Sequence, residues 1–362
     1  MSRTFPRQIK RVVIKVGSGV IANYKLKPRT ARLRSLVEQI ARARRKGVEI
    51  VFVSSGAIVL GMGEMKMRQR PSDLAGLQAL AAIGQRLLMA VYHHLFSRAK
   101  THCAQILLTW DDFDDRRRYN NARKTLEALL DRGVVPVVNE NDTISTDEIK
   151  FGDNDKLSAL VAGMVGADLL LILSDVEGLY TYQDGRRTVF KEVSKITADI
   201  ESLAFGTEKK QISRGGMSAK LEAVKIAVQS RIPCVIAHGE IRDILTRVLK
   251  GERIGTLFLE QEEKLLSKKH WISFGARPKG MLVVDRGAEK ALLEGGKSLL
   301  LPGVTEWSGH FKKDDVVVVC NQDRQEIARG VVAYSVSDLH KIDEKKGKKE
   351  VIHRDELVLC KR

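Results

Sequence analysis

Short apolar runs alternate with longer amphipathic stretches through the first 260 residues, and this rhythm restricts the fold more than any other feature of the sequence. The runs read RVVIKV, VEIVFV, CAQILL, VVPVV, DLLLIL, PCVIA and GTLFLE. Several are apolar almost throughout, as strands must be when helices cover both faces of a sheet. Periodicity between the runs predicts helices near residues 30–46, 73–99, 119–132, 154–166, 216–230 and 240–250. We therefore predict an α/β fold, a mainly parallel, doubly wound sheet with helices on both faces.

The pattern changes near residue 261, and a chain of 362 residues is long enough for two domains. Residues 1–260 form the predicted catalytic domain, and residues 261–276 are interpreted as a linker. Residues 277–362 contain short strand-like runs and one helical stretch near 287–294. This pattern predicts a small, mostly-β barrel at the carboxyl end.

The net charge of +17 is concentrated at the amino end, where residues 1–50 hold 14 Lys and Arg but only two acids. Much of this charge lies on a predicted amphipathic helix whose apolar stripe contains Leu33, Leu36, Val37 and Ile40. Runs of charge on such a helix are usually solvated surface, so we favour that interpretation over a polyanion site.

The four cysteines, Cys103, Cys234, Cys320 and Cys360, lie far apart without a C-x-x-C pair. Their spacing favours neither a disulfide framework nor a zinc site. The amino terminus lacks a cleavage-site pattern, and we expect no stretch to approach the ~18 apolar residues of a membrane span. We expect a cytoplasmic protein with no membrane contact and no metal ligands of its own.

Polar and glycine residues follow the predicted strands, at the edge where ligands bind in a doubly wound sheet. They are Lys15, Gly17, Ser18 and Gly19 after the first run, Ser54 to Ala57 after the second, Asn139 to Asp142 after the fourth, Gly152 to Asp155 before the next helix, Ser174 and Asp175 after the fifth, and Arg214 to Lys220 at the start of a helix. Glycine turns and helix starts let backbone N–H groups approach an anion closely. Together these residues predict a phosphate-binding edge.

Two lysines at glycine-rich turns, Lys15 and Lys220, face a rim that contains Asp142, Asp155 and Asp175. Phosphoryl transfer needs positioning and positive charge more than covalent chemistry from the protein. A carboxylate acceptor with a pKa of about 4.3 would already be ionised at pH 7 and would need no general base. The residues therefore predict a kinase of an anionic substrate, with lysines and Mg²⁺ offsetting the repulsion between anions.

A nicotinamide-dependent oxidoreductase is the runner-up, because Gly17 to Ala22 fits the dinucleotide pattern G-x-G-x-x-A after a strand. However, NYKLKPRT follows in place of an immediate helix, and the second strand ends in Ser54 and Ser55 without an acid for a ribose. The eight histidines are scattered and indicate no hydrolytic triad.

Several motifs in their order along the chain resemble the amino acid kinase family, and within it the glutamate 5-kinases. They are VIKVGSG, VSSGAI, VVPVVNEND, EIKFGDNDKLSALVA, LLILSDVEGLY and GGMSAKLEAVKIA. The later segments SLLLPGVTEWSGHFKKDDVVVVCN, IARGVVAYS and VIHRDELVL are similar to a PUA domain. The resemblance implies ATP-dependent phosphorylation of the γ-carboxylate of L-glutamate to L-glutamyl 5-phosphate, the first step of proline synthesis, with proline as a feedback inhibitor.

Carried over residue by residue, the resemblance implies three groups of site residues. The catalytic group is Lys15, Lys220 and Asp155, with Asp155 holding the lysines. The glutamate-binding group is Ser55, Gly56, Asp142 and Asn154. The ATP-binding group is Lys15, Gly17, Ser174, Asp175, Arg214, Gly215, Gly216, Met217, Ser218, Ala219 and Lys220. Gly17 and Gly56 are expected to offer backbone N–H donors.

This chain departs from the family's G-T-G-G-M-x-T-K motif, because Ser213, Arg214 and Ala219 replace the usual residues. Arg214 would supply a compensating charge. We expect a homo-oligomer with ATP and L-glutamate as its partners. A kinase of another acidic metabolite and an RNA-binding protein that acts through the PUA-like segment stay open as alternatives.

Overall fold

We describe the chain from a computed structural model that covers residues 3, 5, 7–144, 154–183, 186–205, 216–260, 271–341 and 349–359. The chain divides into two compact units. The first comprises Met1–Asp112 with Arg117–Lys264, and the second comprises Phe113–Arg116 with Leu265–Arg362.

An eight-stranded sheet forms the centre of the described part of the first unit, in the order β3-β4-β2-β1-β5-β9-β10-β8. The strands are β1 (Arg11–Val16), β2 (Glu49–Ser54), β3 (Cys103–Leu108), β4 (Val135–Glu140), β5 (Leu169–Ser174), β8 (Glu192–Val193), β9 (Cys234–His238) and β10 (Thr256–Phe258). Every neighbouring pair is parallel except β9 and β10. The predicted mainly parallel sheet is therefore confirmed.

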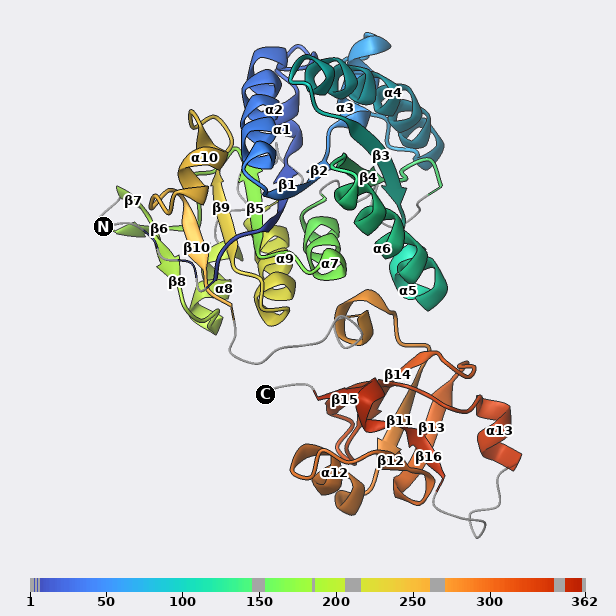
Figure 1. The fold of residues 1–362 in the computed structure, drawn as a ribbon. Coiled ribbons are helices and arrows are strands. Elements are labelled where there is room, and N and C mark those ends of the chain that lie inside the picture. The colour runs from blue at the N-terminus through green and yellow to red at the C-terminus, as the bar shows by residue number, and fades with distance from the viewer. Residues whose placement is uncertain are drawn as a thin grey trace. The chain divides into compact units, whose positions relative to one another are not determined.

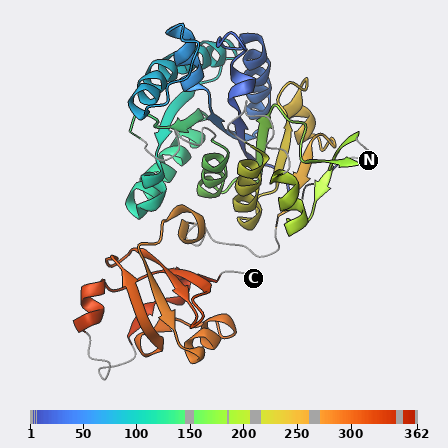
Figure 2. The same ribbon diagram turned by 180° about the vertical axis from the view of Figure 1, so that it is seen from behind.

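Helices cover both faces of this sheet (Figure 1). They are α1 (Ser18–Ile21), α2 (Thr30–Arg45), α3 (Ala57–Glu64), α4 (Leu74–Arg98), α5 (Trp110–Asp114), α6 (Arg116–Asp131), α7 (Asp155–Val165), α8 (Ala198–Phe205), α9 (Met217–Gln229) and α10 (Ile244–Leu249). Figures 1 and 2 show α2, α3 and α4 on one side of the sheet and α6, α7 and α9 on the other. A small hairpin of β6 (Tyr180–Gln183) and β7 (Arg186–Val189) lies outside the sheet.

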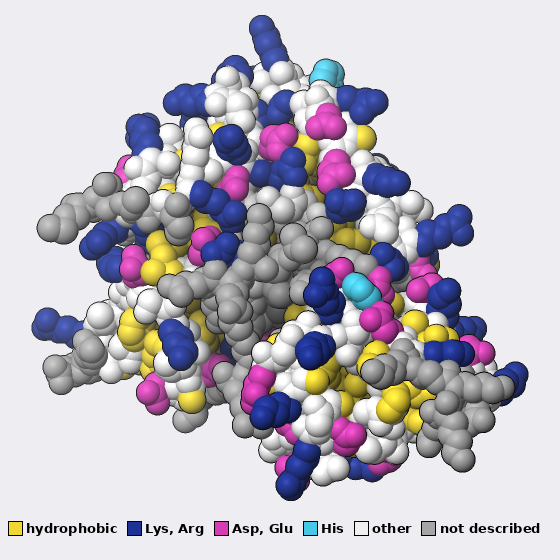
Figure 3. Space-filling model, turned by 60° about the horizontal axis from the view of Figure 1, so that its bottom comes forward, with side chains coloured by type: hydrophobic (Ala, Val, Ile, Leu, Met, Phe, Trp, Pro, Cys, Tyr) yellow, Lys and Arg dark blue, Asp and Glu magenta, His cyan; other side chains and the backbone are white. Residues whose placement is uncertain are grey.

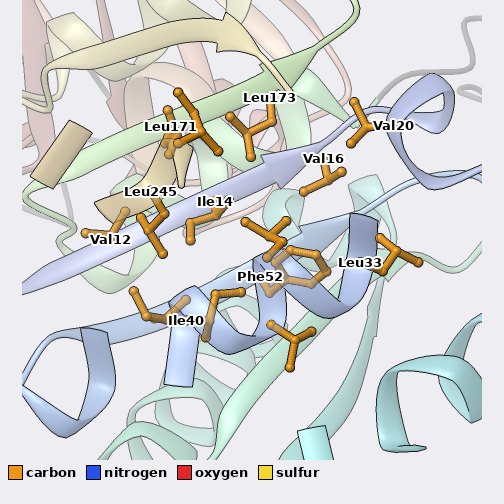
Figure 4. Packing of buried hydrophobic residues seen from close by; sticks show 14 of the residues in the cluster. Val12, Ile14, Val16, Val20, Leu33, Ile40, Phe52, Leu171, Leu173 and Leu245 are labelled. Carbon is orange, nitrogen blue, oxygen red and sulfur yellow. The ribbon is translucent and has the colours of Figure 1, made fainter. Parts of the chain in front are cut away.

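One hydrophobic cluster lies between β1 and the helices α2 and α4 (Figure 4). Val12, Ile14 and Val16 point into it from alternate positions of β1, and Phe52 joins them from β2. Alternation along a strand sends the intervening residues to the opposite face. Lys15 therefore points toward α7, which packs against β1 and α9.

α4 is the single helix in the described ranges that is long and apolar enough, by length and composition, to cross a membrane. The expectation that no stretch has this property is therefore wrong for Leu74–Arg98. Only 28% of the most apolar 18-residue stretch of this helix is buried inside the chain. Leu88 and Tyr92 of α4 nevertheless lie fully in the core, as in a helix of a globular protein.

The second unit contains a five-stranded sheet in the order β13-β11-β14-β15-β17 and a two-stranded sheet of β12 and β16. The strands are β11 (Gly280–Val284), β12 (Leu299–Leu300), β13 (Val304–Gly309), β14 (Val316–Cys320), β15 (Glu326–Val331), β16 (Glu350–Ile352) and β17 (Leu357–Leu359). Its helices are α12 (Arg286–Leu293) and α13 (Val336–Lys341), with short turns η1 (Trp271–Gly275), η2 (Leu301–Gly303) and η3 (Arg354–Glu356). The mostly-β character of this unit agrees with the prediction. Residues 261–270 of the predicted linker lie outside the described residues.

Candidate active site

The carboxyl ends of the central strands bring the predicted site residues to one edge of the sheet. β1 lies between β2 and β5, with β4 beyond β2 and β9 beyond β5. The chain connections therefore diverge at β1, which is where ligands bind in a doubly wound sheet. Lys15 is the penultimate residue of β1, while Ser54 and Ser174 end its two neighbours.

Asp155 joins the two predicted lysines at this edge. Its Oδ1 atom lies 2.5 Å from Nζ of Lys15, and its Oδ2 atom lies 3.2 Å from Nζ of Lys220. Lys15 comes from β1, Asp155 is the first residue of α7, and Lys220 lies in the first turn of α9. Each lysine therefore occupies one oxygen of the same carboxylate.

All three side chains are buried, with 0% of Lys15, 1% of Asp155 and 4% of Lys220 accessible to solvent. With each group in its ordinary charged form, two ammonium ions and one carboxylate leave one positive charge. A buried charge is costly unless another group compensates it. An anion that enters from the strand ends would supply that compensation, so the arrangement favours a negatively charged ligand.

A chain of amide side chains holds the residue that precedes Asp155. Asn154 Nδ2 donates to Ser54 O at 2.5 Å and to Asn139 Oδ1 at 2.6 Å. Asn139 Nδ2 in turn donates to Gln85 Oε1 at 2.7 Å. The Nε2 atom of Gln85 then donates to Oε1 of Gln105 on β3 at 3.2 Å. These contacts fix the start of α7, and with it the carboxylate between the lysines.

Ser55 and Gly56 follow β2 beside this chain of amides. The Oγ atom of Ser55 is buried and has no hydrogen-bond partner in the part of the chain that the structure describes. A buried hydroxyl without a partner is unfavourable, so this atom fits a ligand group. Gly56 precedes α3 at φ 90°, in the left-handed region where a glycine is favoured.

Asp142 lies in the polar segment after β4, and its pKa differs from that of an ordinary aspartate. Burial raises the pKa of Asp142 to about 7. The Glu140 carboxylate also raises this pKa, whereas Arg70 lowers it. Burial disfavours the ionised form of a carboxylate, and a nearby cationic ligand group stabilises that form. Its position therefore fits the amino group of a substrate.

Gly17 differs in its role from the sequence expectation. Its N–H group donates to Leu173 O at 2.9 Å, so this donor is already used within the sheet. A methyl group at Gly17 would instead lie 3.8 Å from Nζ of Lys15.

The remaining predicted nucleotide residues lie at β5 and at the start of α9. Ser174 Oγ donates to Asp175 Oδ1 at 2.9 Å. Gly216 is the residue before α9, and the helix then begins with Met217, Ser218, Ala219 and Lys220. The predicted residues Arg214 and Gly215 lie outside the described residues, as does Ser213.

The dinucleotide interpretation of Gly17 to Ala22 is wrong. The segment forms only α1, a single turn of four residues, and the next helix, α2, begins at Thr30. A dinucleotide fold needs a longer helix that begins directly at the glycine turn.

Sequence reasoning missed the parts of the site that lie on α4 and β3. Gln85 belongs to α4, and Tyr92 of the same helix shares a hydrogen bond of 2.8 Å with Ser54 Oγ. The sequence gives no signal that singles out Gln85, because α4 also contains the polar residues Gln78 and Arg86. It gives none for the contact between Tyr92 and Ser54 either.

Comparison with known proteins gives two family matches and several relatives of nearly full length. The amino acid kinase family matches residues 10–238, and the PUA domain matches residues 280–354. A glutamate 5-kinase of Caldanaerobacter subterraneus subsp. tengcongensis is 44% identical over 97% of this chain and 98% of its own. A glutamate 5-kinase of Geobacter sp. is 42% identical over 99% and 100%. One of Nitrosospira multiformis is 43% identical over 98% of each.

The family match covers more than half of the chain and includes both lysines, Asp155 and the strand ends between them. The relatives extend this likeness through the carboxyl-terminal unit. The chain therefore belongs to the amino acid kinase family, among the glutamate 5-kinases, and it carries a PUA domain.

Proposed function

We propose that this chain transfers the terminal phosphoryl group of ATP to the γ-carboxylate of L-glutamate. The product is L-glutamyl 5-phosphate, the first intermediate of proline synthesis. The observation that carries the proposal is the single carboxylate of Asp155 between two buried ammonium groups at the strand ends. The names of the full-length relatives supply the substrate.

The two lysines act on the repulsion between the substrates. A carboxylate and a phosphate at ~4 Å repel by about 4 kcal/mol for each pair of unit charges at an effective dielectric of 20. Lys15 and Lys220 place positive charge where the phosphoryl group moves, and this lowers the barrier to transfer. The γ-carboxylate is ionised at neutral pH, so the reaction needs no general base.

Asp155 is a positioning residue in this scheme. It separates and orients the two ammonium groups, and it lowers the cost of holding them in the interior before substrates arrive. The amide chain through Asn154 fixes where that carboxylate lies. Loss of Asp155 would leave two buried cations without their shared partner.

The glutamate site lies between β2 and β4 in this proposal. Ser55 Oγ donates to the substrate, the Asp142 carboxylate accepts from its amino group, and Asn154 contacts it beside the lysines. Gly56 would offer its backbone N–H group to the substrate at the start of α3. The unsatisfied Ser55 hydroxyl and the unusual ionisation of Asp142 support these assignments.

The nucleotide site lies on the other side of β1. It would be lined by Ser174, Asp175 and residues 214–220. The phosphates would lie over Lys15 and Gly17. No cluster of three His, Cys, Asp or Glu side chains suited to a metal occurs within the described ranges. We propose that Mg²⁺ enters on the phosphates of ATP, because this ion binds commonly through substrate phosphates and water.

The proposal is tested by following ADP release with hydroxylamine present, which traps an acyl phosphate as a hydroxamate. Glutamate, aspartate and N-acetylglutamate are compared as acceptors. We expect ADP and hydroxamate with glutamate, and at least tenfold lower kcat/KM with the other two. Equal or better turnover of another acid would assign the chain a different substrate. ADP release without hydroxamate would contradict acyl phosphate formation.

Further expectations from the family resemblance remain proposals. Proline would inhibit by competing at the glutamate site, and the enzyme would work in the cytoplasm. RNA binding through the PUA domain stays open, and the charge distribution gives it little support. On the face shown in Figure 3, Lys and Arg side chains are interspersed with Asp and Glu and do not form one track.

We also propose that the chain forms a homo-oligomer through the outer face of α4. Most of the apolar 18-residue stretch of this helix is not buried inside the chain. Beside it lies an apolar hollow of 510 Å³ that contains Leu87 and Val91 of α4 and Leu60 of α3. Exposed apolar surface of this extent is commonly covered by another protein surface.

A further inference from the structure

A second cavity lies at the opposite end of the sheet from the two lysines. It measures 750 Å³ and is formed by the end of α2 with Val48, by the end of α10, and by Arg3, Phe5, Arg7, Gln8 and Ile9. Ile9 on its wall precedes Lys15 by six residues, which is about 20 Å along an extended strand at ~3.3 Å per residue. The cavity is therefore separate from the proposed active site.

One wall of this cavity is apolar and rigidly supported. Phe5, Ile9, Val48 and Leu249 line it, and each packs against the central hydrophobic cluster while part of its surface stays accessible. The amino-terminal segment is held in place because Arg3 N donates to Gly251 O at 2.5 Å. The cavity thus offers a preformed apolar surface next to solvent.

The polar lining of the cavity is positive, with six cationic side chains and no acidic one. Three of the six are engaged in the fold. Arg3 donates to Lys191 O at 2.9 Å and to Ile254 O at 3.1 Å, Arg7 lies 3.5 Å from Asp168, and Arg42 lies 3.1 Å from Asp243.

The other three cations, Arg45, Lys46 and Lys250, have no acidic partner in the described part of the chain. Arg45 and Lys46 end α2, and Lys250 ends α10. Cations are common at such positions because a helix carboxyl end carries about −0.5 charge. All three side chains are exposed to solvent, and two helix ends supply about −1 against three positive charges, so about two positive charges remain on this part of the cavity lining.

We propose that this cavity binds a small dianionic ligand with an apolar or aromatic body, of the phosphate monoester class. The phosphate would lie among Arg45, Lys46 and Lys250, because guanidinium and ammonium groups pair strongly with phosphate oxygens. The body of the ligand would lie on the wall of Phe5, Ile9 and Leu249. The volume is within the usual range for small-molecule sites.

The test uses 1-naphthyl phosphate as the probe and calorimetric titration of the full chain. We expect saturable binding of one probe molecule per chain. In Arg45→Ala with Lys250→Ala, the affinity should fall at least tenfold. The matched control, Arg34→Ala with Arg98→Ala, removes the same charge from exposed positions and includes a helix end, so it should bind like the unaltered chain.

Three further arms separate this cavity from other sites. Lys220→Met should keep the affinity, because Lys220 belongs to the distant triad. Inorganic phosphate and 1-naphthol should each bind at least tenfold more weakly than the probe. The proposal is overturned if the cavity variant binds as well as its control, if Lys220→Met abolishes binding, or if inorganic phosphate matches the probe.

Discussion

At the scale of single residues, the site depends on a few buried polar side chains that the fold brings together from distant segments. Lys15 and Lys220 could be singled out in the sequence because each follows or precedes a glycine turn at the edge of the predicted sheet. Their shared contact with Asp155 could not, because which oxygen faces which lysine depends on how α7 and α9 pack. Gln85 was overlooked for the same reason, since its partner Asn139 lies on a strand far along the chain.

Asp142 gives a prediction for the pH dependence of the reaction. An aspartate with a pKa of about 7 is ionised above that pH and protonated below it. If its carboxylate binds the substrate ammonium, kcat/KM for glutamate should be level above pH 8 and fall about tenfold per pH unit well below pH 7. Asp142→Asn should have a low kcat/KM that does not vary in this range. A wild-type profile that is flat from pH 8 to pH 5.5 would contradict the role given to Asp142.

At the scale of secondary structure elements, glycines set how closely α3 and α4 approach. A Cβ atom at Gly84 would lie 1.7 Å from Ala57 O, and one at Gly61 would lie 2.0 Å from Leu80 O. The long strands and amphipathic helices of the sheet were predictable from periodicity. α3 was not, because its sequence AIVLGMGE is apolar on all sides and contains two glycines, which leaves no helical pattern to recognise.

Close packing of α3 on α4 predicts that Gly84→Ala destabilises the protein. The new methyl group would force the helices apart, and overpacking of this kind typically costs about 1–3 kcal/mol. Chemical denaturation should show this loss. Gly19→Ala is the control, because a methyl group there meets nothing within 4 Å, and it should be neutral or slightly stabilising. Equal stability of the two variants would contradict the close contact.

At the scale of the whole molecule, the sequence predicted two domains of different class in the right order, and both family matches agree with that order. The loss of the long amphipathic stretches between apolar runs, near residue 261, was sufficient for this prediction. The choice of glutamate could not be derived from the sheet pattern, because many kinases of anions would place lysines at the same edge. The predicted segments that carry Arg214 and Asp153 lie outside the described residues, so their part in the site stays a prediction.

The partly exposed apolar face of α4 predicts a dimer or higher oligomer in solution. Sedimentation velocity at micromolar concentration should show it for the unaltered chain. Leu87→Glu with Val91→Glu should shift the chain to monomers, because two charges on this face oppose its burial. The control is Lys124→Glu with Arg132→Glu, two exposed positions of which the first lies on α6 and the second directly follows it, and it should leave assembly unchanged. A monomeric unaltered chain would contradict this proposal.

The most direct test of the account compares the turnover of two lysine variants of α9. Lys220 is buried against Asp155, whereas Lys225 on the same helix is partly exposed and paired with Glu201 at 2.7 Å. We predict that Lys220→Met lowers kcat for glutamate-dependent ADP formation by about 10²–10³-fold, the usual cost of removing one group that stabilises transition-state charge. Lys225→Met should stay within about twofold of the unaltered chain, because exposed ion pairs contribute little. Near-normal kcat in a folded Lys220→Met variant would contradict the central claim that the paired ammonium groups drive phosphoryl transfer.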